Sequence, residues 1–280
     1  MTDVLLATCS GCRDGEPEGH LLVEELDGLG ISAAWASWDD PAVDWDAAAL
    51  VGVRSTWDYQ LRRAEFLAWA DAVGAHLLNG PRVLAWNTEK SYLVDLIGLG
   101  LPVVPTQVAR TAGEVAHRVR ALGQAVVKPT VGASGRGVVV LDDPSQPPAG
   151  IGPWVVQPVL DSIRTEGEAS VFVLGGRVAS QVRKVPAGGG SILVHERYGG
   201  RSYAVPVSAE HAQLATRTVH AAEQLLDARL DYARVDLMRL ADGTLAVGEL
   251  ELTEPGLYLD VLPANAQAFA AMVAARLDRR

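Results

Sequence analysis

The stretch YARVDLMRLADGTLAVGELEL, from Tyr232 to Leu252, predicts its own geometry. Two alternating apolar runs flank the pair Asp242-Gly243, which favours a two-residue type I′ turn. We therefore expect a β-hairpin in which Ala241 faces Thr244 across the turn.

Charged side chains share one face of this predicted hairpin. Pairing outward from the turn sets these residues opposite each other: Met238 and Val247, Asp236 and Glu249, Arg234 and Glu251. Carboxylates directly across a strand pair repel, so Asp236, Glu249 and Glu251 require positive charge nearby. Oxygen ligands without His or Cys suit a hard cation such as Mg²⁺. The alternative is a solvated acidic face that Arg234 partly neutralises without a metal.

The composition is that of a soluble globular protein, with 280 residues, 49% hydrophobic and 21% charged. A net charge of -10 disfavours sequence-independent binding to nucleic acid, which rests on Lys and Arg. The start, MTDVLLATCSG, has no basic region typical of a signal peptide, and no apolar run is long enough to span a membrane. We therefore expect a cytoplasmic protein with neither a nucleic-acid nor a membrane partner.

Cys9 and Cys12 form a CxxC motif near the end of the first predicted strand. The spacing permits redox chemistry, whereas a zinc site would need two more ligands that no nearby His pair supplies. A redox role for the two cysteines stays open.

The first part of the chain is predicted to be a small α/β unit, with a helix around Leu21 to Leu26. Its strands are expected at three apolar runs: Val4 to Ala7, Ile31 to Ala34 and Leu50 to Val53. Ligands of open α/β sheets bind beyond the carboxyl ends of strands. Arg54, Ser55 and Thr56, which follow the third run, are therefore candidates for a substrate pocket.

A glycine-rich loop joins two apolar β runs within Ala125 to Val140. Gly132, Gly135 and Gly137 would let backbone N–H groups approach an anion closely. The loop is not a Walker A motif, because it lacks GK[ST], leads into a strand, and has Lys128 before it.

Other elements follow from local signals. Asn87 is expected to cap a helix to about Ile97, with Lys90 in its first turn, where a cation opposes the helix dipole. Pro186 to Tyr203 is glycine-rich and expected to be mobile, so that Arg197 and Arg201 would close over a ligand. The remaining predictions are a capping box at Thr111 and Glu114, strands at Trp154 to Pro158, Ala169 to Leu174 and Val178 to Val185, and helices from Ser208 to about Arg229 and from Pro263 to Leu277.

Lys128 on a strand, the glycine-rich hairpin and the late acidic hairpin together resemble the ATP-grasp superfamily. Asn87-Thr-Glu-Lys90 and Val127-Lys-Pro are similar to the bacterial glutathione synthetase and RimK branch. WDDPAVDW, VRSTWDY and VRKVPAGGG resemble the ATP-grasp ligases that close the D-cycloserine ring.

The resemblance implies a mixed α+β and α/β ATP-grasp fold in three parts. Residues 1–84 would form a small N-terminal α/β domain on the substrate side, and residues 85–156 a central subdomain with the glycine-rich loop. Residues 157–280 would form a C-terminal subdomain with the Mg²⁺-binding hairpin.

The resemblance also implies roles for individual residues. ATP would be bound by Lys90 and Lys128 at its phosphates, by Gly132, Ala133, Ser134, Gly135 and Gly137 over the β and γ phosphates, by the backbone of Val155 to Gln157 at the adenine, and by Glu168 at the ribose. Asp236, Glu249 and Glu251 would hold two Mg²⁺, and Arg234 with Lys184 or Arg201 would steady the transferred phosphoryl group. Two departures are Glu251, where many members have Asn, and Ser170, where the glutathione branch tends to have a basic residue.

The implied activity is ATP-dependent ligation of a carboxylate and an amine through an acyl phosphate, with ADP and phosphate released. Its most specific form is ring closure of a small amino acid derivative, in the manner of O-ureidoserine becoming cycloserine. Alternatives are an intermolecular amino acid or peptide ligase of the RimK or glutathione type, a non-catalytic nucleotide-binding protein, and a redox partner that uses the CxxC. The implied partner is a small amino acid-like carboxylate substrate, and a homodimer and a homotetramer both remain open.

Overall fold

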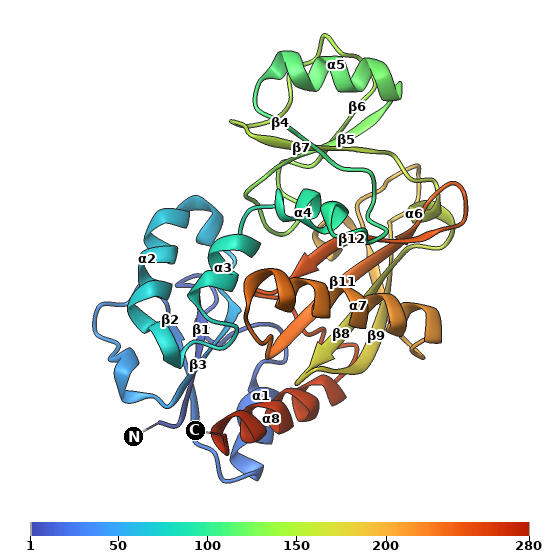
Figure 1. The fold of residues 1–280 in the computed structure, drawn as a ribbon. Helices are drawn as coiled ribbons and strands as arrows, with labels where there is room; N and C mark the ends of the chain where they lie inside the picture. The colour runs from blue at the N-terminus through green and yellow to red at the C-terminus, as the bar shows by residue number, and fades with distance from the viewer. Residues whose placement is uncertain (1, 280) are drawn as a thin grey trace.

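Three β-sheets and their helices make up the fold (Figure 1). The computed structural model of the protein describes residues 2 to 279. The first sheet is parallel, with the order β2-β1-β3, and contains β1 (Val4–Thr8), β2 (Ala33–Ser37) and β3 (Leu50–Ser55). Its helices are α1 (His20–Gly28), α2 (Arg63–Val73) and α3 (Pro81–Asn87). The predicted α/β unit is thus confirmed, with strand ends that differ by a few residues.

The second sheet is antiparallel and lies at the top of Figure 1. It has the order β4-β7-β5-β6, with β4 (Gln107–Ala109), β5 (Ala125–Pro129), β6 (Val139–Leu141) and β7 (Trp154–Pro158). Helix α5 (Ala112–Leu122) covers it and buries Val115 and Val119 against Val127. The hydroxyl of Thr111 accepts the backbone N–H of Glu114 at 3.2 Å, which confirms the predicted helix start.

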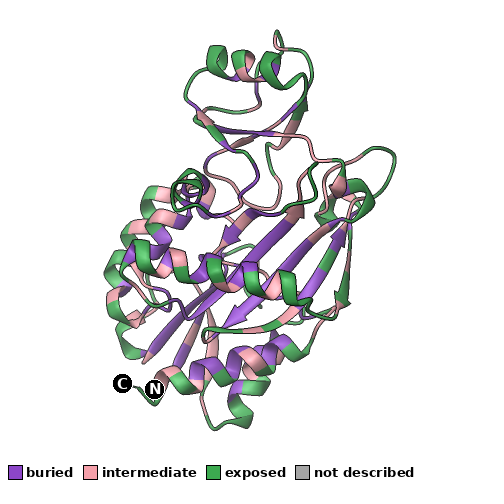
Figure 2. Ribbon diagram, turned by 45° about the vertical axis from the view of Figure 1, so that its right-hand side comes forward, coloured by how far each residue is buried: buried purple, intermediate pink, exposed green. Residues whose placement is uncertain are grey.

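The third sheet is antiparallel, and its purple strands in Figure 2 are buried on both faces, while the edge at β10 is largely exposed. Its order is β10-β9-β8-β11-β12, with β8 (Glu168–Leu174), β9 (Arg177–Val185), β10 (Arg201–Val205), β11 (Tyr232–Arg239) and β12 (Leu245–Glu251). Val171 and Val235 pack on one face in a core shared with α4 (Tyr92–Gly98) and α7 (Ala209–Leu226). Phe172 and Tyr232 pack on the other face, with α8 (Ala264–Leu277) and β1. The sheet is therefore the centre on which the other parts are assembled.

Helices α7 and α8 agree with the sequence, since Ser208 caps α7 and Pro263 precedes α8. A short helix, α6 (Ser162–Thr165), links the second and third sheets. Among the residues described, no helix has both the length and the apolar character that a membrane crossing requires.

The acidic hairpin has two irregularities that cancel. Its turn is a three-residue loop, in which Leu240 N–H donates to Thr244 O at 2.8 Å and Gly243 has a φ of +86°. The predicted two-residue turn is wrong, because the glycine supplies the left-handed residue of a longer loop. This shifts the register near the turn by one, so Met238 pairs with Ala246 and not with Val247. A β-bulge at Gly248 then restores the predicted pairs, Asp236 with Glu249 and Arg234 with Glu251.

The predicted helix from Asn87 to Ile97 is wrong, because Asn87 is the last residue of α3 and a new helix starts at Tyr92. The Asn87 amide is engaged elsewhere: it donates to Leu250 O at 2.7 Å and accepts from Leu252 N–H at 2.7 Å. Asn87 therefore ties α3 to β12. Lys90 lies in the link between α3 and α4 and not, as predicted, in the first turn of a helix.

Candidate active site

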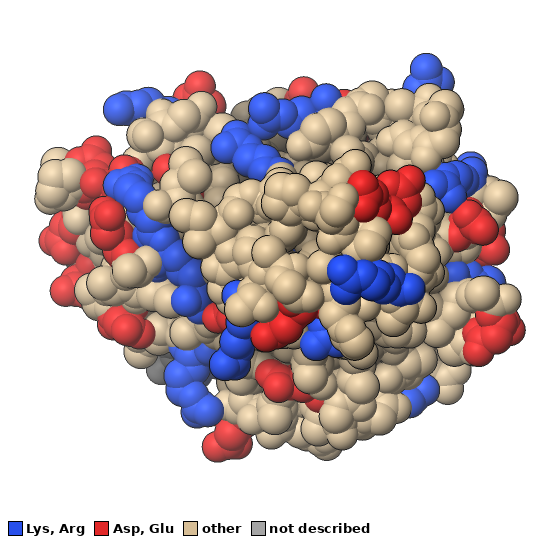
Figure 3. Space-filling view, turned by 90° about the horizontal axis from the view of Figure 1, so that it is seen from above, with Lys and Arg blue, Asp and Glu red and all other residues tan. Residues whose placement is uncertain are grey.

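A cavity of about 450 Å³ lies where the three sheets meet. The second sheet contributes Lys128 and the glycine loop, and the third contributes Lys184 and the acidic hairpin. The first part of the chain contributes Trp57 and Tyr59. Figure 3 shows that Lys and Arg atoms lie beside Asp and Glu atoms on the top of the molecule. The interspersed charges indicate local pairing rather than a field of one sign.

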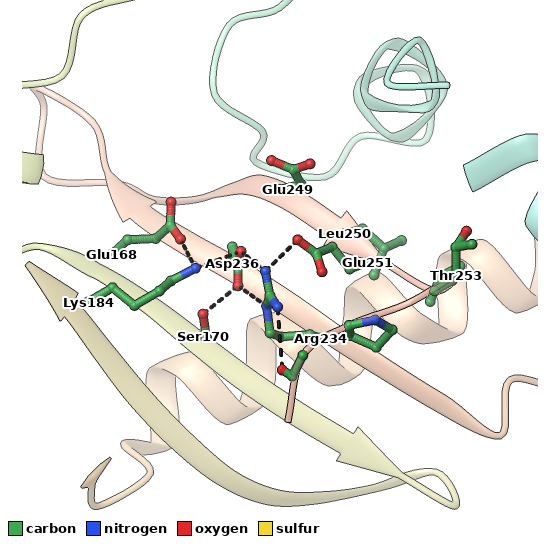
Figure 4. A network of polar contacts seen from close by, with 12 residues as sticks. Glu168, Ser170, Lys184, Arg234, Asp236, Glu249, Leu250, Glu251 and Thr253 are labelled. Atoms are coloured by element: carbon green, nitrogen blue, oxygen red, sulfur yellow. Dashed lines mark hydrogen bonds and ion pairs between the residues drawn. The ribbon is translucent and has the colours of Figure 1, made fainter. Parts of the chain in front are cut away.

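Asp236 is the centre of a buried network on β11 (Figure 4). Its Oδ1 accepts from Arg234 Nε at 2.9 Å and from Ser170 Oγ at 2.6 Å. Its Oδ2 accepts from Arg234 Nη2 at 2.9 Å and from Lys184 Nζ at 3.0 Å. Burial alone would raise the pKa of Asp236, but Arg234 and Lys184 hold it well below its usual range. The carboxylate is therefore ionised and its acceptor positions are filled.

Glu249 faces two lysines from outside its own sheet. Its carboxylate lies 3.2 Å from Lys90 Nζ and 3.6 Å from Lys128 Nζ. Burial raises the pKa of Glu249, but the two lysines outweigh it and bring the value to about 2. Lys90 also donates to Gly132 O at 2.6 Å, so the same cation reaches the glycine loop.

The pKa values of Glu251 and Glu254 are raised, whereas that of Glu249 is lowered. Burial, with Asp236 and Glu249 nearby, raises the pKa of Glu251 to about 7 despite its ion pair with Arg234. Burial and the charge of Glu251 raise the pKa of Glu254 to about 8. At this end of the site Arg234 is in an ion pair with Glu251. Sequence reasoning missed Glu254, although its position just beyond the end of β12 is a signal that could have found it.

In the structure, the three carboxylates predicted to hold a metal are each in an ion pair with a cation. Arg234 and Lys184 both donate hydrogen bonds to the Asp236 carboxylate. Residues 2–279 contain no group of three His, Cys, Asp or Glu arranged for a metal. Arg234 is in ion pairs with Asp236 and Glu251, and three lysines are in ion pairs with Asp236 and Glu249. Glu249 and Glu251 nevertheless line the cavity, and the raised pKa of Glu251 fits a site that accepts a cation.

The glycine loop and the segment from Pro186 to Tyr203 meet at the mouth of the cavity. Gly132, Ala133, Ser134 and Gly135 line it, whereas Gly137 does not. Tyr198 donates its hydroxyl to Gly135 O at 3.3 Å and so joins the two segments.

Residues of the second segment reach the cavity selectively. His195 lines it, whereas Arg201 is exposed on β10 and does not. His195 Nδ1 accepts the backbone N–H of Arg197 at 3.1 Å. Burial and the charges of Lys184 and Arg234 lower the pKa of His195, which favours a neutral ring. Sequence reasoning did not single out His195, whose position inside the glycine-rich segment was the available signal.

Of the residues predicted to contact the adenine and the ribose, Gln157 and Glu168 line the cavity, whereas Val155 and Val156 do not. Gln157 donates its side-chain amide to Thr106 Oγ1 at 2.7 Å. Glu168 forms an ion pair with Lys184, and burial raises the pKa of its carboxyl group.

Arg54, Ser55 and Thr56 are buried and do not line the cavity. Arg54 meets an anion of the protein itself, because its Nη2 donates to Glu16 Oε1 at 2.8 Å and to Pro255 O at 2.6 Å. Ser55 Oγ lies 2.7 Å from the hydroxyl of Thr8. The structure thus places Arg54 behind the cavity wall, where it binds Glu16 and the backbone carbonyl of Pro255.

The two cysteines lie outside the cavity. Cys9 is buried, and burial together with Cys9 raises the pKa of Cys12 to about 11. A raised pKa disfavours the reactive thiolate.

Comparison with known proteins gives a consistent result. The family model for the N-terminal domain of D-cycloserine synthetase DcsG matches residues 4–79. The cycloserine biosynthesis protein DcsG of Streptomyces lavendulae is 32% identical over 279 residues, covering 91% of this chain and 92% of its own. The crystal structure of D-cycloserine synthetase DcsG has a TM-score of 0.86 at 28% identity, with 98% of this chain and 99% of that chain covered. The ATP-grasp ligase PsnB, solved with a precursor variant, Mg and ADP, shares the fold at a TM-score of 0.67, with 18% identity and 98% of each chain covered.

Proposed function

Because the chain belongs to the family of the D-cycloserine synthetase DcsG and is an ATP-grasp ligase, we propose that it activates a substrate carboxylate with ATP. A nitrogen of the same small molecule then attacks the acyl phosphate and closes a ring. The products are a cyclic amide, ADP and phosphate.

The observation that carries the proposal is the ring of four cations around one cavity: Lys90, Lys128, Lys184 and Arg234. Each is held by a carboxylate of the hairpin, so each is already in place before a ligand arrives. A triphosphate would take over Lys90 and Lys128 from Glu249. The cost of reorganisation would be small, because the lysines need not move far.

Mg²⁺ fits the residues that this exchange leaves free. Glu249 and Glu251 would hold it, and Asp236 would join them when phosphate oxygens engage Arg234 and Lys184; two ions are expected. Bound Mg²⁺ would neutralise charge on the phosphates and orient them.

The chain's own residues would then act by position and charge. The backbone of Gly132 to Gly135 would cover the β and γ phosphates, while Lys184 and Arg234 would stabilise charge on the transferred group. The substrate carboxylate would attack the γ phosphate directly. Holding the nitrogen next to the activated carboxyl group can be worth about 7 to 11 kcal/mol, which ring closure uses most fully.

An isotope experiment tests the reaction class. With ¹⁸O in the substrate carboxylate, one label is expected in the released phosphate, and ADP is the expected nucleotide product. AMP with pyrophosphate, or unlabelled phosphate, would contradict an acyl phosphate. ADP release should also depend on one substrate alone, since a requirement for an added amine would indicate an intermolecular ligase.

A further inference from the structure

The backbone on both sides of Glu254 is held in place by buried side chains from distant parts of the chain. The contacts are Asn87 Oδ1 with Thr253 N–H at 3.1 Å, Tyr232 OH with Thr253 O at 3.1 Å, Arg54 Nη2 with Pro255 O at 2.6 Å, and Glu16 Oε2 with Leu257 N–H at 2.7 Å. These side chains come from the first part of the chain, α3 and β11. The segment is therefore a rigid support and not a mobile loop.

The Glu254 side chain, in contrast, is not held. It lines the cavity, and among residues 2–279 its carboxylate forms no ion pair and receives a hydrogen bond only from its own backbone N–H. Asp236, Glu249 and Glu251, which line the same cavity, each have a cationic partner. The carboxylate is partly buried, and among the described residues no Lys or Arg lies within ion-pair distance of it. The raised pKa of Glu254, caused by burial and by Glu251, agrees with this.

The neighbours of Glu254 are suited to a small cation. Trp57 and Tyr59 line the same cavity as Glu254, and the pKa of Tyr59 is raised by burial and next by the charge of Glu254. Aromatic faces add to the attraction for a cation. Glu16 also lines the cavity, but its oxygens already accept from Arg54 and Leu257. Glu254 is thus the partly buried carboxylate that a ligand would meet there, whereas Asp260, which also lines the cavity, is exposed.

We propose that Glu254 binds the protonated amino group of the substrate. This rests on the proposed function, in which the substrate is a small amino acid derivative. The ammonium group would supply the positive charge that Glu254 lacks. The carboxyl group of the substrate would then point toward Lys184 and Arg234, where phosphoryl transfer would take place. Glu254 would act as the residue that selects amino acids over simple carboxylic acids.

The test compares two probes in an ADP-release assay with Mg²⁺ and ATP. One is O-ureidoserine, as D and L forms, and the other is 3-(ureidooxy)propanoic acid, which lacks only the α-amino group. The wild-type protein should prefer the amino compound by about 100-fold in kcat/KM, as expected for a charged hydrogen bond in a partly buried site. Glu254→Gln should lose about 100-fold on the amino compound, change less than about threefold on the other, and so abolish the preference.

Controls separate this role from a structural one. Glu25→Gln, at an exposed carboxylate of α1 that does not line the cavity, should keep the preference. Thermal unfolding and ATP binding should show that Glu254→Gln is folded. A preference that survives in Glu254→Gln, or an equal loss on both probes, would overturn the assignment while leaving the ligase activity established. If the wild-type protein released ADP with neither probe nor any amino acid, the proposed function would fail and this assignment with it.

Discussion

At the scale of single residues, two buried cations depend on one carboxylate. Lys184 and Arg234 are almost fully buried, and both bind Asp236. Burial lowers the pKa of Lys184, but Asp236 and then Glu168 raise it above its usual value, so the lysine stays charged. The sequence alone suggests that removing a carboxylate from this cluster relieves repulsion. The side-chain contacts indicate the reverse for Asp236.

Asp236→Asn should therefore lower the free energy of unfolding by about 3 to 5 kcal/mol, because it leaves two buried cations without their shared partner. Urea denaturation in EDTA measures this change. Asp71→Asn, at an exposed position of α2, serves as the matched control and should change stability little. Equal stability of Asp236→Asn and the parent would show that the network contributes nothing to the fold.

The raised pKa of Glu254 predicts a pH dependence of stability. Its carboxyl group has a value of about 8 in the folded protein, against 4.5 for the ordinary group. The folded state therefore binds a proton more tightly than the unfolded state, and this contribution to stability falls as pH rises from about 5 through 8. Thermal unfolding of the ligand-free protein in EDTA should show a smaller decline over this range in Glu254→Gln. Parallel curves for both proteins would rule out the assignment of this slope to Glu254.

At the scale of elements, sequence reasoning worked where a pattern is local. The alternation of β11 and β12 predicted the hairpin and the pairing of Asp236 with Glu249. It missed the three-residue turn and the bulge at Gly248, which each shift the register by one and cancel. Side-chain partners distant in sequence were beyond its reach. Arg54 reaches Glu16 across 38 residues, and Asn87 reaches β12 across more than 160, which no local signal encodes.

The glycine loop and the segment around Tyr198 should behave as one mobile unit, because the Tyr198 hydroxyl binds Gly135 O. Hydrogen exchange in Gly132 to Gly137 and in Pro186 to Tyr203 should slow when Mg²⁺ and a nonhydrolysable ATP analogue bind. Tyr198→Ala should speed exchange in the glycine loop of the ligand-free protein about fivefold, a loss of about 1 kcal/mol. Tyr203→Ala, at an exposed residue of β10, is the control. Unchanged exchange in both segments at saturating nucleotide would contradict closure.

At the scale of the whole molecule, backbone hydrogen bonds and ion pairs join the second sheet and the segment before it to the third. Val104 N–H donates to Val247 O at 2.9 Å, and Val247 N–H donates to Pro102 O at 2.8 Å, beside the start of the second sheet. Across the cavity, Lys90 and Lys128 reach Glu249. The backbone contacts form one side of the junction and the ion pairs the other. A ligand that replaces these ion pairs therefore changes the contacts that hold the second sheet against the third.

This arrangement makes Glu249 a competitor of the nucleotide as well as a candidate metal ligand, and the two roles predict opposite effects. In Glu249→Gln, Lys90 and Lys128 lose the carboxylate that occupies them, so ATP without metal should bind about tenfold more tightly, a gain of about 1.4 kcal/mol. Mg²⁺-dependent ADP formation should nevertheless fall by at least about 100-fold, because a proposed metal ligand is lost. Titration calorimetry in EDTA measures the first effect and an ADP-release assay the second. Lys128→Met is the matched variant and should weaken metal-free binding. Weaker binding of metal-free ATP to Glu249→Gln would mean that Glu249 positions the lysines for phosphate and does not compete with it.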